Sequence, residues 1–465
     1  MSELTPLRMY RTCEMKLHLR LAAFTCILLL LFCSTLFALD RQPNSDYRAR
    51  RMALAEKLDG GVAVIFAATE AEGPNATYGF RQDNNFFYLS GSIEPGAALV
   101  VAPASSKNSS QPYTEILFLP QRNPRQEKWT GPKLGPDDPQ APALTGFDRV
   151  ASLDTLTAEV AKLLAAGRPA IYLDQPVSGE QNSASSFLEW ARRTNTLPLR
   201  VGINDVKPAI ASLRVIKDTG EVERIRHATS ASVAAHFAAL KAIKPGINEH
   251  DISALMQYEF MKNGCERPAY APVVGSGFYS TVLHYFQDDQ PIRDGDVVVM
   301  DVAGEYAMYA SDITRTAPAN GKFTARQREI YDIVLGAQQA AINAFQSGVS
   351  TLSGDNSLYK AAYDYINSHG KDLHGQTLGP YFIHGLGHYV GLAVHDVGDN
   401  KAPLGPGRVF TIEPGIYIPE EKLGVRIEDI FWVDAGGKLV NLSGALPHAA
   451  DEVEAAMAGT FKPKN

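Results

Sequence analysis

Five residues in the last third of the chain have side chains suited to binding metal ions: Asp301, Asp312, His388, Glu413 and Glu428. Each stands in a short apolar or glycine-rich segment, where burying a charged group without a partner costs free energy. Four carboxylates and one imidazole carry too much negative charge for a closed pocket unless cations neutralise it. Two ions bridged by shared carboxylates would use all of these ligands, which indicates a dinuclear metallohydrolase.

The segment around the two aspartates predicts a hairpin. Residues 296–301 (DVVVMD) have the pattern of a buried strand that ends in an acid, and residues 311–315 (SDITR) would return antiparallel after a turn at 305–309. Neighbouring strands of such a hairpin can place Asp301 and Asp312 side by side. A surface hairpin with two solvated aspartates is the alternative reading of this pair alone.

A glycine-rich segment carries three histidines, His384, His388 and His395, out of eleven in the chain. Its glycines argue against a helix, because each costs about 1 kcal/mol relative to alanine. The segment also lacks the glutamate of the helical His-Glu-x-x-His zinc motif. Glycine beside histidine allows the backbone to approach a ligand closely.

Two further acids stand in strand-like segments. Glu413 precedes Pro414-Gly415, which turns the chain, and residues 424–433 are predicted to form one strand in which Arg426 and Glu428 face the same side. A simple ion pair between Arg426 and Glu428 would explain this pattern. Equally, Glu428 could bridge metal ions while Arg426 balances the excess negative charge.

Composition sets the broad class of the protein. The chain has 465 residues, 45% hydrophobic and 20% charged, with a net charge of −7, which is ordinary for a soluble globular protein of two or three domains. No basic block is present, so nucleic acid is not an expected partner. Of the four cysteines only Cys265 lies beyond the N-terminal apolar run, so the folded part is expected to form no intrachain disulfide.

The N-terminus has the order of an export signal. Arg8, Arg11, Lys16 and Arg20 precede an uncharged apolar run at residues 21–39. We expect residues 1–40 to be a signal peptide, and the 19-residue run is also long enough to be a membrane anchor. In either case the folded part is expected outside the cytoplasm, in the periplasm or secreted.

The remaining chain predicts two domains. In residues 41–213, apolar segments at 61–67, 97–102, 115–119 and 171–173 alternate with helical patterns at 48–58 and 153–164, which predicts a small α/β domain. In residues 214–465, Asp218 and Glu221 predict the start of a helix that ends before Lys244. Further helices are expected at 250–262 and 325–345, and strands at 296–302, 409–412 and 424–433. Helices and strands are segregated along this part of the chain rather than alternating, which predicts an α+β domain.

Five motifs resemble those of the aminopeptidase P and prolidase family in order and spacing: residues 293–302, 311–316, 384–396, 411–417 and 425–429. The resemblance implies a C-terminal pita-bread catalytic domain with a curved antiparallel sheet, as in methionine aminopeptidases, preceded by a smaller α/β N-terminal domain. It also implies roles for particular residues. The family's metal ligands fall on Asp301, Asp312, His388, Glu413 and Glu428, its outer histidines on His284, His384 and His395, and its active-site arginine on Arg426.

Residues 311–330 look more like aminopeptidase P than bacterial prolidase, so the resemblance implies release of the first residue from peptides with proline in second position. Two divalent ions, manganese by preference, would be the cofactors, and Glu413, His284 and His395 the catalytic groups. The substrate would contact His284, His384, His395, Tyr417, Arg426 and Trp129, the last helping to close the site.

The family is also expected to form a homodimer or homotetramer. Prolidase, which cleaves only Xaa-Pro dipeptides, is the nearest alternative; a silent binding module and a metal-free creatinase-type hydrolase fit the complete ligand set less well. One departure is Asn85, where the family usually has an aspartate. This puts in doubt a contribution of residues 81–88 to binding the substrate's amino group.

Overall fold

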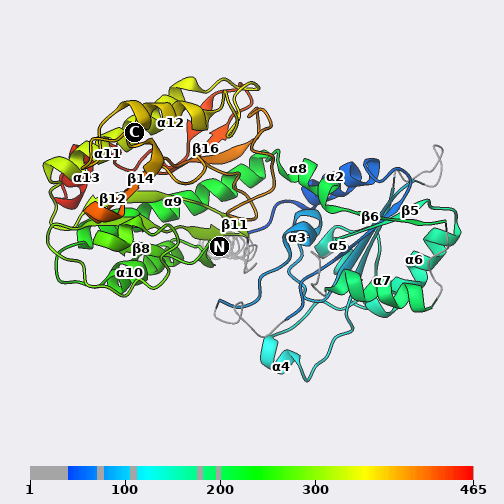
Figure 1. Ribbon diagram of the computed structural model, residues 1–465. Helices are drawn as coiled ribbons and strands as arrows, with labels where there is room; N and C mark the ends of the chain where they lie inside the picture. Colours follow the sequence, from blue (N-terminus) through cyan, green and yellow to red (C-terminus); the bar gives the residue numbers. More distant parts are fainter. Residues whose placement is uncertain (1–39, 71–77, 105–112, 175–181, 195–199, 464–465) are drawn as a thin grey trace, which may run out of the picture. The chain divides into compact units, whose positions relative to one another are not determined.

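Two groups of secondary-structure elements follow one another along the chain (Figure 1). The computed structural model describes residues 40–70, 78–104, 113–174, 182–194 and 200–463. The predicted signal or anchor lies outside these residues. Within them, no helix has both the length and the apolar character needed to cross a membrane.

The first group is built on a six-stranded sheet of order β4-β3-β2-β1-β5-β6. The strand pairs β1–β2 and β2–β3 are antiparallel, whereas β3–β4, β1–β5 and β5–β6 are parallel. The strands are β1 (Val62–Phe66), β2 (Ala98–Pro103), β3 (Tyr113–Leu119), β4 (Val150–Ser152), β5 (Ala170–Leu173) and β6 (Gly202–Asp205). The helices are α2 (Asn44–Glu56), α3 (Asn84–Ser90), α4 (Glu127–Thr130), α5 (Ala141–Thr145), α6 (Leu156–Ala165), α7 (Ser183–Arg193) and α8 (Lys207–Arg214).

Burial on both faces explains why the central strands of this sheet are continuously apolar. Val62 and Val64 of β1 belong to a core cluster with Val160 of α6 and Phe187 of α7. Helices α2 and α3 contact β2 as well. The predicted α/β arrangement, with strands in the expected apolar segments, is confirmed for these elements.

The second group consists of long helices and short antiparallel strands, as predicted for an α+β domain. Its helices are α9 (Thr219–Ala242), α10 (Glu249–Lys262), α11 (Ala325–Ala344), α12 (Leu358–Ser368) and α13 (Ala450–Met457). Helix α9 begins with the predicted capping box, because Asp218 accepts from the backbone N–H of Glu221 and the Glu221 side chain accepts from that of Asp218. In Figure 1, α11 and α12, drawn in yellow, lie beside each other, and the two helices are in contact.

The strands of the second group form several small sheets with only antiparallel pairing. They are β7 (Arg267–Pro268), β8 (Val273–Ser276), β9 (Val297–Asp301), β10 (Gly304–Tyr306), β11 (Tyr309–Ala310), β12 (Thr314–Pro318), β13 (Val409–Ile412), β14 (Gly415–Ile418), β15 (Leu423–Arg426), β16 (Asp429–Val433) and β17 (Leu439–Asn441). Their orders are β12-β9-β8, β11-β10-β7, β13-β16-β17 and β14-β15.

The single strand predicted at residues 424–433 is wrong in one respect, because it is interrupted at residues 427 and 428. Before the interruption β15 pairs with β14, and after it β16 pairs with β13. At the interruption Glu428 bridges to Thr314 of β12 instead, its N–H donating to the Thr314 carbonyl. Changing partners in this way joins three sheets at one residue, which a sequence periodicity does not reveal.

The residues from Gln42 to Asn465 form one compact unit. The first and second groups of elements are both part of this unit, and contacts between them are contacts within it. The domain boundary near residue 213 stays a prediction. Cys265, the cysteine expected in the folded part, is buried and free.

Candidate metal centre and active site

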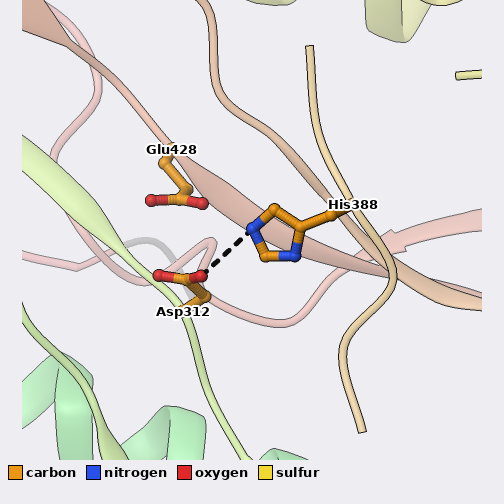
Figure 2. Close-up of side chains that lie close together, drawn as sticks. All are labelled: Asp312, His388 and Glu428. Atoms are coloured by element: carbon orange, nitrogen blue, oxygen red, sulfur yellow. Dashed lines mark ion pairs between the residues drawn. The ribbon is translucent and has the colours of Figure 1, made fainter. Parts of the chain in front are cut away.

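All five predicted ligands line one cavity of about 400 Å³. The four carboxylates lie where a strand ends or between two strands, and His388 lies in the irregular segment before β13. Asp301 ends β9, Asp312 lies between β11 and β12, Glu413 lies between β13 and β14, and Glu428 lies between β15 and β16. Figure 2 shows the side chains of Asp312, His388 and Glu428 pointing toward one another, with the His388–Asp312 ion pair dashed. The sequence positions thus converge from four separate parts of the chain.

The hairpin prediction placed Asp301 and Asp312 side by side on neighbouring strands, but the observed strand register differs. Asp301 pairs with Thr314 across the β9–β12 ladder, so Asp312 lies two residues beyond its direct partner. The reason is the tight turn at Ala307 and Met308, both with positive φ, which closes the separate pair β10–β11. Burial raises the pKa of Asp301, Arg426 opposes this, and the two carboxylates remain close enough for the charge of Asp312 to raise the pKa as well.

His388 is held by the strand that carries Glu413. Its N–H donates to Thr411 Oγ1 at 3.1 Å, and the Glu413 N–H donates to the Leu386 carbonyl at 2.8 Å. This pairing is so close that a Cβ on Gly387 would lie 2.1 Å from the Thr411 carbonyl oxygen. Glycine is required there for the approach of a neighbouring strand, whereas the expected reason was the approach of a ligand.

The imidazole of His388 is oriented for ligation. Its Nδ1 lies 3.2 Å from the Tyr389 carbonyl, and an N–H donated there leaves Nε2 facing the carboxylates. Nε2 lies 3.3 Å from Asp312 Oδ2 and 3.3 Å from Glu413 Oε1. Burial lowers the pKa of His388, but the hydrogen bond to Asp312 and the charge of Glu413 outweigh it and raise the pKa to about 9.

The ion pair between Arg426 and Glu428, one of the two explanations that the sequence left open, is not formed. Arg426 Nη2 donates to Asp301 Oδ2 at 2.7 Å, its Nη1 to the Tyr417 hydroxyl at 2.9 Å, and its Nε to Thr314 Oγ1 at 3.1 Å. Thr314 in turn donates to Glu428 Oε2 at 2.7 Å. The guanidinium therefore supports one ligand directly and a second through a hydroxyl.

The electrostatics of the cavity favour bound cations. Burial raises the pKa of Glu413 to about 7, and burial together with the charges of Asp312 and Glu413 raises the pKa of Glu428 well above its ordinary value. Crowded carboxylates resist losing their protons unless positive charge is supplied. Arg426 supplies one such charge, and four acids need more.

The donor atoms also fit metal ions geometrically. One ligand atom from each of Asp312, His388 and Glu428 lies within 4.8 Å of the others. Among the described residues, Asp301 Oδ1 and Asp312 Oδ1 are buried and have no hydrogen-bond partner. Unpaired buried carboxylate oxygens that face a cavity are expected where a cation completes the site.

The other predicted site residues divide into two sets. His284, His384, His395 and Arg426 line the same cavity, and Tyr417 contacts it through His384 Nε2, 2.8 Å from the Tyr417 hydroxyl. The His395 ring lies 4.2 Å from that of His388, centroid to centroid. Trp129 lies on α4, is 86% exposed and is not among the residues that line this cavity.

Several residues in the cavity or beside it were not predicted from the sequence. Tyr270 lines the cavity, and burial together with the charge of the neighbouring Asp301 raises its pKa. Phe286 lines the cavity and stacks on His284 with centroids 5.7 Å apart. Thr314 connects Arg426 to Glu428. Thr314 lies within the predicted hairpin, which was a usable signal, whereas Tyr270 and Phe286 stand in segments with no periodic pattern.

Comparison with known proteins agrees with this geometry. Residues 223–435 match "Metallopeptidase family M24", and residues 47–172 match "Aminopeptidase P, N-terminal domain". The Xaa-Pro aminopeptidase of Escherichia coli is 34% identical over 90% of this chain and 99% of the relative, and Xaa-Pro aminopeptidase 3 of Mus musculus is 34% identical over 88% and 85%. The structure of E. coli aminopeptidase P in its low pH form superposes with a TM-score of 0.79, at 32% identity, over 90% of this chain and 99% of that chain.

The fold and the site thus define a metal-dependent aminopeptidase. The chain belongs to the aminopeptidase P group of metallopeptidase family M24. The predicted family and its pita-bread fold are confirmed.

Proposed function

We propose that this protein is an exported Xaa-Pro aminopeptidase that uses two divalent metal ions, with manganese as the working metal. The observation that carries the proposal is the convergence of five ligand side chains on one cavity with two unpaired carboxylate oxygens. The naming of full-length relatives as Xaa-Pro aminopeptidases supports the substrate class.

Asp301, Asp312, His388, Glu413 and Glu428 would hold the two ions. Bound there, the ions would lower the pKa of a water molecule and polarise the peptide carbonyl. An oxygen-rich site with a single imidazole suits manganese and also admits cobalt, iron or zinc.

Glu413 acts as the general base in this proposal. Thr411 Oγ1 donates to its Oε1 at 3.1 Å and so orients the carboxylate. Burial raises the pKa of Glu413, which favours its acceptance of a proton from water, and bound cations would favour its return. The amine that leaves an Xaa-Pro bond must be protonated, and either Glu413 or a neighbouring histidine can supply that proton.

The histidines surround the place where the peptide would lie. His395 would donate a hydrogen bond to the oxyanion that develops on the substrate carbonyl. His284 and His384 would contact the proline, beside an apolar wall that contains Leu283, Phe286 and Val394. Burial lowers the pKa of His384 to about 4, so this imidazole stays neutral. Its hydrogen bond with the Tyr417 hydroxyl fixes the orientation of the ring.

Export and assembly remain proposals drawn from the N-terminal sequence and from the family resemblance. The basic residues before the apolar run at 21–39 support cleavage of a signal, with membrane anchoring as the alternative. A homodimer or homotetramer is compatible with the large exposure of Trp129. In the position that it has within this chain Trp129 does not line the cavity, so it could close a site only from a different position.

The deciding experiment compares a tripeptide Xaa-Pro-Yaa with a dipeptide Xaa-Pro. Both are incubated with metal-stripped protein, with and without added Mn²⁺, and products are separated by chromatography. We expect metal-restored release of the first residue from the tripeptide. Cleavage of the dipeptide alone would move the assignment to prolidase, and cleavage of neither with two ions bound would reject the substrate class.

A further inference from the structure

The segment that carries His395, residues 390–396, is itself neither helix nor strand. Val394 and His395 both line the cavity, and residues 391–395 form bends rather than regular structure. Within the segment the Gly391 N–H donates to the Ala393 carbonyl, and the Asp396 N–H donates to the Tyr389 carbonyl at 2.8 Å. Backbone bonds hold the start of the segment: the Ala310 N–H of β11 donates to the Gly391 carbonyl at 2.8 Å, and the Val390 N–H donates to the Val409 carbonyl of β13 at 3.1 Å. Closer to His395, at Leu392 and Asp396, the contacts come from side chains elsewhere in the fold.

Arg81, just before α3, supplies the first of these contacts. Its Nη2 donates to the Leu392 carbonyl at 2.7 Å, and its Nε donates to Glu305 at 2.8 Å. Its Nη1 donates to Asn84 Oδ1 at 2.9 Å. One planar guanidinium thus joins the N-terminal segment, β10 and the His395 segment in a fixed geometry, which a flexible ammonium cannot reproduce.

Asp396, the residue after His395, supplies the second contact. Its carboxylate accepts from Lys217 Nζ at 2.9 Å and from Arg214 Nη2, and its side chain is 1% exposed. The other arm of Arg214 donates to Asn85 Oδ1 at 2.7 Å, and Asn85 Nδ2 donates to Asp174. The amide of Asn85 bridges a cation and an anion, which a carboxylate at this position could not do without facing Asp174 with like charge.

We propose that residues 81–85 are a positioning element for the reaction: through Arg81 on Leu392 and through Asn85 and Arg214 on Asp396, they hold His395 in its catalytic orientation. This inference rests on the proposed function. It also gives Asn85 a task that does not involve the substrate's amino group, and Asn85 is not among the residues lining the cavity.

The expected effect falls on the rate rather than on substrate binding. Arg81 touches none of the predicted metal ligands, so its loss leaves the ions and the ground-state contacts in place. A catalytic group displaced by about 1 Å can lower the rate by about 100-fold. We therefore expect Arg81→Met to lower kcat by about 10- to 100-fold, with KM changed by less than about twofold and two ions still bound.

The test is a double-mutant cycle between Arg81→Met and His395→Ala. If Arg81 acts through His395, adding Arg81→Met to the His395→Ala protein lowers kcat by less than about twofold. Arg267→Met is the matched control, because Arg267 donates to the carbonyl of Phe80, the residue before Arg81, and pairs with the same Glu305, but has no hydrogen bond to the His395 segment among the described residues. Equal losses in Arg81→Met and Arg267→Met, or effects of Arg81→Met and His395→Ala that multiply, would overturn the proposal.

A second variant distinguishes loss of the contact from misfolding of the protein. Arg81→Lys keeps a charge beside Glu305 but lacks the second arm that reaches Leu392, so it should fold and still lose rate. In hydrogen exchange, we expect peptides that cover residues 389–396 to exchange faster in Arg81→Lys than in wild type or Arg267→Met. Unchanged exchange would refute the positioning role.

The exchange measurement needs no substrate, so it separates the two proposals. A wild-type protein that cleaves no Xaa-Pro peptide would reject the proposed function, while faster exchange in Arg81→Lys would still support the hold on the His395 segment. Cleavage by wild type with multiplying effects in the cycle would leave the function standing and reject only this inference.

Discussion

Replacing Gln338 by leucine removes a clamp behind the metal centre. Gln338 of α11 is 2% exposed, and its Nε2 donates to Asp429 Oδ2 at 3.0 Å, to the Ile412 carbonyl at 3.1 Å and, more weakly, to the Ile427 carbonyl at 3.4 Å. Ile412 directly precedes Glu413, and Ile427 directly precedes Glu428. One side chain therefore connects the two strand ends that carry these predicted ligands.

The size of the effect follows from these contacts. An amide has two N–H groups, so Gln338 makes two good hydrogen bonds at a time. Losing one bond to a charged acceptor costs about 1.5–3 kcal/mol, and losing one to a backbone carbonyl costs about 0.5–1.5 kcal/mol. Asp429 keeps its ion pair with Arg315 at 2.7 Å, so it is not left as an unpaired charge. We expect Gln338→Leu to lower the free energy of unfolding by about 2–4 kcal/mol.

The adjacent residue provides the control. Gln339 is exposed and contacts only Asn343 of the same helix among the described residues, at 2.8 Å. Gln339→Leu should change the free energy of unfolding by less than about 0.5 kcal/mol. The assay is urea unfolding of the metal-stripped proteins, followed by circular dichroism, and then titration with Mn²⁺. Gln338→Leu should also bind Mn²⁺ more weakly. Equal stability of the two variants would refute the clamp.

The remaining predictions concern the ligands, the outer histidine and a buried histidine. Glu428→Ala should lower metal content and activity together, measured by elemental analysis and tripeptide cleavage, and full activity in this variant would reject the dinuclear site. His395→Ala should keep its metal and lose rate, so loss of metal would place His395 among the ligands. Burial lowers the pKa of His236 to about 3, and its Nε2 lies 3.0 Å from the Val302 carbonyl. Because the folded pKa lies below the unfolded value, stability is complete above about pH 6.5 and is lost as the pH falls, by about 2 kcal/mol between pH 8 and pH 5. His236→Gln should lack this part of the pH dependence in urea unfolding, and parallel profiles would contradict it.

The candidate ligands could be found from the sequence because their chemistry is local. An acid that ends an apolar strand, or a histidine between glycines, is costly to bury without a function. The helix start at Asp218 was predictable for the same reason, since a capping box uses residues three apart. Such patterns depend on neighbours in the chain and need no knowledge of the tertiary fold.

Contacts between distant segments could not be predicted in this way. The interruption at Glu428 arises because β15 and β16 pair with different strands, and the clamp of Gln338 joins residues 74 to 91 positions apart. The contact of Arg81 with Leu392 spans 311 positions. Hydrogen bonds of this kind depend on the orientation of packed elements, and sequence periodicity carries no information on that orientation.

By itself, the sequence predicted a set of candidate metal ligands and the two kinds of domain, because residue type and short spacing decide ligand chemistry and local backbone structure; the class of reaction followed from the resemblance of its motifs to a known family. The tertiary structure alone decided that Arg426 contacts Asp301 directly and Glu428 only through Thr314, that Asn85 bridges Arg214 and Asp174 instead of lining the cavity, and that Trp129 is not among the residues that line the cavity. Each of these contacts joins segments that are far apart in the sequence. Which of them meet depends on how the helices and strands pack to bury their apolar faces.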